Sequence, residues 1–249
     1  KNALNKPEIL APVGGSEQLL AAVRSGADAV YFGLQNFNAR RNAENFAGEG
    51  IDDTVAYCHI RGVKVYITIN ILVKDSELSD MKKAVDTAAL AGADGIIVQD
   101  LAVARYIRSR WPGLPLFAST QLVCHNAEGV RELKKLGFSK FVLARELSLA
   151  EIRQVIERTG EAVEVFVHGA HCMSVSGACY MSAMIGGRSG NRGLCAQPCR
   201  LDWRLNGKEY ALSLKDLSYV EHMKELAEIG VASFKIEGRM KRDEYVAAD

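Results

Sequence analysis

The sequence lacks the motifs that identify several large classes of enzyme. It contains no GxGxxG or Walker loop, which would indicate a nucleotide site, and neither a GxSxG elbow nor an HExxH zinc motif. No apolar run in this sequence is long enough to span a membrane, and we expect no signal peptide. The formal net charge is only +1, so binding of nucleic acid must depend on a local basic patch. These absences give little support to hydrolysis by a known serine or zinc motif, or to a membrane partner.

The composition is typical of a globular protein. Of the 249 residues, 48% are hydrophobic and 24% are charged, and one α/β barrel commonly has this length. Cys58 and Cys124 stand alone in apolar segments, as buried free thiols do, so we expect a reducing, cytoplasmic compartment. The sequence starts at Lys1 and stops at Asp249 inside a predicted helix, so we expect a fragment of a longer protein that lacks its C-terminal part.

Short apolar segments alternate with helical periods along the whole chain. Each apolar segment is bounded by Gly or polar turns, as strands buried on both faces of a parallel sheet are. The predicted strands are 8–11, 29–32, 63–69, 95–98, 116–119, 140–144, 163–167 and 232–236, and the predicted helices are 16–24, 53–61, 78–90, 101–109, 126–135, 148–158 and 217–228. Eight strands in strict alternation predict a closed (β/α)8 TIM-type barrel that forms one domain over residues 1–249. An open doubly wound sheet is the alternative.

Polar side chains that follow the predicted strands are expected to meet at one mouth of this barrel, where such folds place their active sites. Arginines there present planar donors that suit carboxylates and phosphates. The residues expected to bind substrate are Asn38, Arg40, Asn70, Gln121 and Arg145. The predicted catalytic residues are His168 and Glu237, for proton transfer, and Arg239, which would orient an anionic group. For the Arg40 loop, a solvated surface loop is the alternative.

Four of the six cysteines, Cys172, Cys179, Cys195 and Cys199, fall within 28 residues. Four thiolates suit either tetrahedral zinc or a four-iron cluster. Only the last two cysteines have the spacing of a zinc knuckle, so the pattern favours an iron–sulfur cluster over zinc, and both over disulfides or buried thiols. Residues 170–210 are expected to form a cysteine-rich lid or hairpin inserted after the seventh strand. His171 is either a further ligand, a neighbour of the ligands or a surface residue.

Two segments have a local excess of basic residues. Residues 188–204 contain four arginines against one aspartate, and residues 235–242 contain four basic residues against one glutamate. Both segments are expected on the mouth side of the barrel. A basic rim that holds a phosphate backbone and an ordinary solvated surface both fit this pattern.

Several runs resemble motifs of peptidase family U32, the collagenase-like peptidases. They are EVFVHGAHC at 164–172, SGACYMS at 176–182 and NRGLCAQPCR at 191–200, with further matches at 10–15, 28–33, 212–217 and 235–240. The resemblance covers essentially the whole chain, and the cysteine motif is its most specific part. One departure is His171, where the family has an aliphatic residue.

This resemblance implies two kinds of function. The family is named for proteolysis, but similar members hydroxylate pyrimidines in tRNA or rRNA with iron–sulfur machinery and prephenate. By this likeness the four clustered cysteines would hold a 4Fe-4S cluster. We therefore expect an iron–sulfur-dependent RNA pyrimidine hydroxylase that binds structured RNA and a small anionic metabolite such as prephenate.

Two alternatives to this function stay open. One is a collagenase-like peptidase, for which a serine would pair with His168 or His171, and the other is a binding or assembly module with a structural zinc. The candidate serines are Ser174, Ser176 and Ser182.

Overall fold

Eight parallel strands close into a barrel in the computed structural model, which describes residues 6–40, 43–46, 50–175 and 178–248. β9 pairs with β1 on one side and with β7 on the other, and β6 pairs with β7, so the sheet has no open edge between these strands. The barrel strands are β1 (Glu8–Pro12), β2 (Ala29–Gly33), β3 (Lys64–Ile69), β4 (Gly95–Val98), β5 (Leu116–Ala118), β6 (Lys140–Val142), β7 (Val163–Gly169) and β9 (Ser233–Ile236). The predicted closed barrel is confirmed, and the open sheet is wrong.

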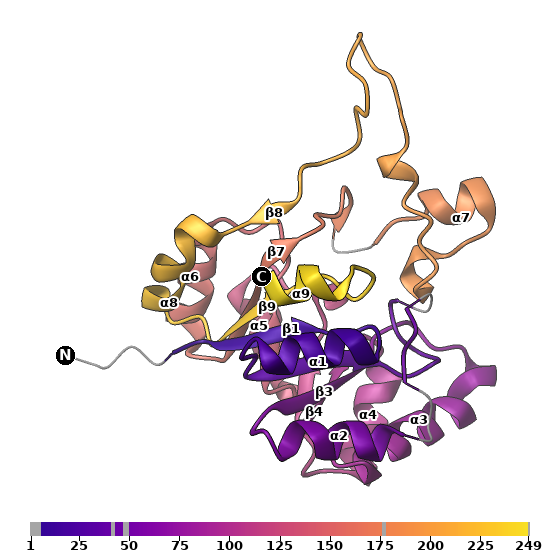
Figure 1. The fold of residues 1–249 in the computed structure, drawn as a ribbon, viewed down its shortest axis with the longest axis vertical. Coiled ribbons are helices and arrows are strands. Elements are labelled where there is room, and N and C mark those ends of the chain that lie inside the picture. The colour runs from indigo at the N-terminus through magenta and orange to yellow at the C-terminus, as the bar shows by residue number, and fades with distance from the viewer. Residues whose placement is uncertain (1–5, 41–42, 47–49, 176–177, 249) are drawn as a thin grey trace.

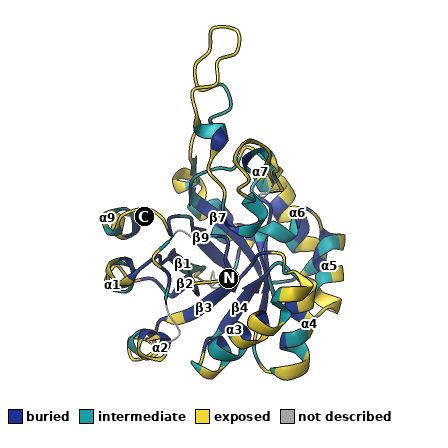
Figure 2. Ribbon diagram, turned by 90° about the vertical axis from the view of Figure 1, so that its right-hand side faces the viewer, coloured by how far each residue is buried: buried dark blue, intermediate teal, exposed yellow. Residues whose placement is uncertain are grey.

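Helices surround the strands, as the view in Figure 2 shows. Side-chain oxygens of Asp100, Asn126 and Ser148 accept backbone N–H groups at three helix starts, which satisfies donors that a helix leaves unpaired. The helices are α1 (Ser16–Arg24), α2 (Ile51–His59), α3 (Leu78–Leu90), α4 (Leu101–Arg110), α5 (Ala127–Lys135), α6 (Leu149–Thr159), α7 (Met181–Gly186), α8 (Met223–Ile229) and α9 (Asp243–Ala248). None of these helices in the described ranges is long and apolar enough to cross a membrane.

The strands bury apolar residues on both faces, but the two faces differ. Side chains on the outer face, such as Val30, Ile67 and Val165, pack in one large core beneath the helices. The inner face holds a small cluster that includes Tyr31 and Phe117, together with charged side chains described below. The inner face therefore provides polar chemistry along the barrel axis.

The predicted helix over 217–228 is wrong in its first half. Leu217–Ser218 form a short strand, β8, that runs antiparallel to β7, with Leu217 opposite Gly169. β7 extends past the ends of β6 and β9, so the backbone groups of its last residues are available to pair with β8. A 3-10 turn follows, and α8 begins only at Met223.

Residues 170–216 connect β7 to β8 and contain all four clustered cysteines. The described part of this segment includes α7 and the 3-10 turns Gly190–Arg192 and Pro198–Arg200, and the segment then extends away from the barrel at the top of Figure 1. Asn206 and Gly207 both have positive φ at the tip, between the bridged residues Leu205 and Lys208, so these two residues form a tight turn. Gly187 closes α7 in the left-handed conformation.

Candidate functional site

A cavity of about 340 Å³ lies at the carboxyl ends of the barrel strands and is covered by the cysteine segment. Its wall contains five cationic side chains, Arg40, Arg145, Arg200, Lys235 and Arg239, against one carboxylate, Glu237. Two of the five pair with carboxylates outside the wall, Lys235 with Glu164 and Arg200 with Asp216. The remaining charges leave the cavity with a net charge of +2, which favours an anionic ligand.

Glu237 is the centre of this charge arrangement. Its Oε1 lies 2.8 Å from Nη2 of Arg40, and its Oε2 lies 3.5 Å from Nη2 of Arg145. Burial by itself would raise the pKa of Glu237, but Arg40, Arg145 and Arg239 outweigh it and lower the pKa to about 2. Such a carboxylate stays ionised at neutral pH, which argues against the predicted proton-transfer role and for a role in holding the arginines.

Arg239 is buried, and its two hydrogen-bond partners lie on β3 and in the turn after β2. Nη1 donates to Oγ1 of Thr68 at 3.1 Å and to Oδ1 of Asn38 at 3.4 Å. Burial lowers the pKa of Arg239 to about 10, although nearby Tyr31 and Glu237 oppose this shift. Arg239 is therefore still a cation at neutral pH and lines the cavity, as a group that orients an anion must.

Asn38 does not contact the cavity and cannot bind substrate there as predicted. Its side chain is fully buried, where Nδ2 donates to the Leu34 carbonyl and Oδ1 accepts the backbone N–H of Arg40 at 2.8 Å. These bonds fix the turn after β2, and that turn carries Arg40 into the wall. Asn70 lines the cavity and also braces the turn, because its Oδ1 accepts the backbone N–H of Ala39.

Gln121 and Arg145 line the cavity with polar atoms that have no hydrogen-bond partner. These atoms are Oε1 of Gln121 and Nε of Arg145, and both are buried. Nη1 of Arg145 donates to the Ala170 carbonyl at 2.8 Å, and its guanidinium stacks on Phe166 at 4.1 Å. A buried unpaired donor or acceptor costs about 1–3 kcal/mol, so these two atoms are suited to pair with a bound ligand.

Cys172, Cys179, Cys195 and Cys199 all line this same cavity, and all are free thiols. Backbone N–H groups of Met181 and Gln197 donate to the sulfurs of Cys179 and Cys195 at 3.4 and 3.3 Å. Burial raises the pKa of the Cys199 thiol, although neighbouring Arg200 opposes this. Across the described ranges, no group of three or more His, Cys, Asp or Glu side chains is arranged to hold a metal ion.

The two histidines near the cysteines lie differently from each other. His168 is absent from the cavity wall; its Nδ1 lies 3.1 Å from the hydroxyl of Tyr245, and the two rings stack. The structure therefore does not bring His168 into the cavity wall with the other predicted site residues. A register shift between Phe166 and His168 changes the strand alternation, so His168 does not follow Phe166 into the barrel. His171 does line the cavity, and burial lowers its pKa.

Two arginines of the predicted basic rim hold the cysteine segment in place. Arg192 donates to the Leu72 carbonyl at 2.6 Å and pairs with Glu77, which ties the segment to the barrel. Arg200 donates to the carbonyls of Leu214 and His171. These contacts favour a structural role for both arginines over a free phosphate-binding rim.

Sequence reasoning missed Lys235 and Glu164 as site residues. Lys235 lines the cavity, and its Nζ lies 2.8 Å from Oε1 of the buried Glu164. The sequence did contain a signal, because Lys235 lies two positions before Glu237 and the period-two alternation of a strand points both toward the axis.

Comparison with known proteins identifies the family. The model of peptidase family U32 matches residues 14–248. The chain belongs to this family. Similar proteins are a tRNA hydroxylation protein of Bacillus subtilis, 38% identical over 97% of this chain, and a collagenase of Porphyromonas gingivalis, 37% identical over 98%. A 23S rRNA 5-hydroxycytidine synthase of Escherichia coli is 38% identical over 96%.

The U32 match covers only part of these longer relatives. The chain spans 61%, 63% and 37% of their respective lengths. A solved U32 peptidase structure superposes with a TM-score of 0.63 at 12% identity, covering 95% of this chain and 94% of that one. At this identity the structural likeness shows the shared barrel fold alone.

Proposed function

We propose that this U32 chain is the barrel of an iron–sulfur-dependent enzyme that hydroxylates a pyrimidine in tRNA or rRNA. The observation that carries the proposal is that four free thiols and a net positive wall share one cavity at the barrel mouth. Relatives at 38% identity are named for hydroxylation of tRNA and of rRNA. Six free cysteines suit a reducing compartment, so the proposed location is the cytoplasm.

The donor set supports a 4Fe-4S cluster held by Cys172, Cys179, Cys195 and Cys199. Backbone N–H bonds to cysteine sulfur are among the features that set the potential of such clusters. The thiols of a four-iron cluster bind different iron atoms, so they need only surround a larger group, whereas zinc ligands converge at about 2.3 Å on one ion. When bound, the cluster would supply electron transfer or a site for the oxygen donor.

The chain's own residues would bind and orient the other reactants. The net charge of +2 suits a dicarboxylate, so prephenate is the proposed anionic co-substrate, held by Arg40, Arg145 and Arg239. Glu237 keeps the first two guanidinium groups in position without accepting a proton. Gln121 offers an acceptor that suits an N–H at the edge of a pyrimidine.

Nucleoside mass spectrometry of RNA from a deletion strain tests this function. We expect loss of one hydroxypyrimidine from tRNA or rRNA, restored by the wild-type gene but not by Cys195→Ser, which changes an exposed cysteine of the cavity wall. Cys124→Ala, a cysteine outside the wall, is the matched control and should restore the nucleoside. Unchanged hydroxypyrimidines in the deletion strain would contradict the proposal.

A collagenase-like peptidase is the second candidate, because a 37% identical relative carries that name. The candidate serines have other contacts: Oγ of Ser174 donates to the Ala178 carbonyl, and Oγ of Ser182 accepts the N–H of Ala196. Ser176 lies outside the described residues. Cleavage of denatured collagen by purified protein, lost on Ser182→Ala while RNA nucleosides stay unchanged, would favour this candidate.

A further inference from the structure

A line of alternating acidic and basic side chains runs through the inside of the barrel. Lys235 Nζ lies 2.8 Å from Oε1 of Glu164, whose Oε2 lies 3.8 Å from Nζ of Lys140. The same Nζ of Lys140 lies 2.7 Å from Oε1 of Glu8. The four residues come from β9, β7, β6 and β1, so the line depends on closure of the barrel.

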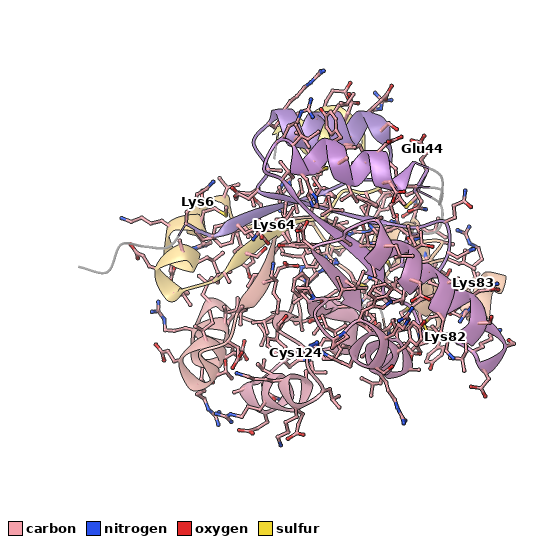
Figure 3. All side chains as sticks on the ribbon, turned by 90° about the horizontal axis from the view of Figure 1, so that it is seen from below. Lys6, Glu44, Lys64, Lys82, Lys83 and Cys124 are labelled. Atoms are coloured by element: carbon pink, nitrogen blue, oxygen red, sulfur yellow. The ribbon has the colours of Figure 1, made fainter. Side chains whose placement is uncertain are left out.

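This line connects two separate hollows of the molecule. Lys235 lines the mouth cavity, whereas Glu8 and Lys140 line a second pocket that also contains Lys6 and Lys64. Lys6 and Lys64, which are labelled in Figure 3, lie at the amino ends of β1 and β3. The mouth cavity is built at the opposite, carboxyl ends of the strands, so the charged line spans the barrel from end to end.

Stability alone is a poor explanation for these charges. The interior of such barrels is commonly filled by branched apolar side chains. Here the side chains of Glu164 and Lys235 are only 1% and 5% exposed. Burying an ion pair costs several kcal/mol per ion in lost hydration, and apolar residues of similar size often stabilise as well or better. A buried charged pair that opens onto a cavity is therefore a candidate for function.

We propose that Lys235 is a catalytic proton donor to the ligand in the mouth cavity, and that Glu164, Lys140 and Glu8 return its proton from the opposite end of the barrel. The identity of the ligand rests on the proposed function. An N–H bond of the Lys235 ammonium breaks, and an O–H or N–H bond forms on the ligand atom where negative charge develops. The neutral amine then takes a proton from Glu164, and Glu164 takes one from Lys140 once side-chain motion brings Nζ of Lys140 from 3.8 Å into hydrogen-bond reach of Oε2. Lys140, held by Glu8 at 2.7 Å, regains a proton from solvent in the second pocket. The net change is one proton moved from solvent to ligand.

Lys235 is better suited to donate a proton than the nearby arginines are, because of its surroundings. Burial lowers the pKa of Lys235, and the positive charges of Lys140 and Arg239 lower it further, while Glu164 opposes them. Tyr31 faces the ammonium through its ring at 4.3 Å. An arginine keeps its proton under all ordinary conditions, so the guanidinium groups of the wall bind charge but do not donate protons.

The first test needs no catalytic activity. Competitive acetylation of the folded protein between pH 6 and 11, followed by mass spectrometry, gives the titration midpoint of each lysine. We expect the midpoint of Lys235 to lie below that of a freely exposed lysine, because burial lowers its pKa. Lys140→Met should raise the midpoint of Lys235, whereas Lys64→Met, which removes the other lysine near Glu8, should not change it. A Lys235 that stays unreactive, or titrates together with Lys64, would overturn the proposal.

The second test separates proton donation from simple charge. Lys235→Arg keeps the charge but not the transferable proton, so it should bind prephenate within threefold of wild type and lose about 10²–10⁴-fold in the rate of hydroxypyrimidine formation. Lys235→Met should lose the same rate and bind prephenate more weakly, and Lys64→Met should keep both. A near wild-type rate for Lys235→Arg would overturn the proposal. If wild-type protein forms no hydroxypyrimidine, the proposed function fails, and the acetylation result alone decides the role of Lys235.

Discussion

Replacing Glu237 by Gln removes the charge that holds the arginines of the mouth cavity. The pKa of Glu237 falls from 4.5 to about 2 in the folded protein, and each unit corresponds to about 1.4 kcal/mol, so the ionised carboxylate contributes about 3 kcal/mol to folding at pH 7. Because the folded pKa is the lower one, this contribution is complete above pH 4.5 and declines as the pH falls toward 2. At pH 3, between the two pKa values, roughly half of this contribution remains by the same linkage.

Urea denaturation at pH 7 and pH 3 measures this effect. Glu237→Gln should be about 3 kcal/mol less stable than wild type at pH 7, and the difference should roughly halve at pH 3. Glu128→Gln is the matched control, because Glu128 also lies between two arginines, Arg131 and Arg158, but is 67% exposed. An exposed pair is worth less than about 1 kcal/mol. A loss at pH 7 as small as that of the control would refute the clamp assigned to Glu237.

Two further changes test how the cysteine segment sits on the barrel. Arg192→Met removes the contacts to Leu72 and Glu77, so proteolysis within residues 188–200 should become at least tenfold faster, with little change in the global free energy of unfolding. Arg204→Met, on the exposed hairpin, is the control and should not change the rate of proteolysis. Equal rates of cleavage in the two variants would contradict the anchoring role of Arg192. Gly193→Ala places a methyl group 2.3 Å from the Asn38 carbonyl oxygen. It should therefore lower the midpoint of thermal unfolding clearly more than Gly187→Ala. Gly187 also has a positive φ, but among the described residues outside its own helix no atom lies within 4 Å of the added methyl group. Similar losses in both glycine variants would show that the close approach at Gly193 has no energetic effect.

The sequence predicted the barrel well because its elements depend on local pattern. The predicted strand 95–98 is β4 and the predicted helix 78–90 is α3, since both combine a clear apolar period with a Gly boundary. The helix predicted from residue 217 fails because Leu217 pairs with Gly169, far away in sequence. Local propensity carries no information about such a partner.

The site was predicted less completely, for geometric reasons. The position of Arg40 follows from its place after a strand, but its pairing with Glu237 joins residues 197 apart. His168 was misplaced because a bulge changes the alternation of β7, and bulges have weak sequence signals. Lys235 was overlooked as a cavity residue because its charge suggested a solvated rim, whereas strand alternation places it inside.

The cluster assigned to the four cavity cysteines is the central claim, and metal analysis after anaerobic reconstitution with iron and sulfide tests it most directly. We predict about four iron and four sulfide per chain with visible absorption. This content should be lost in each of Cys172→Ser, Cys179→Ser, Cys195→Ser and Cys199→Ser but kept in Cys58→Ala and Cys124→Ala. A colourless protein with one zinc per chain, or iron that survives all four serine variants, would contradict the account.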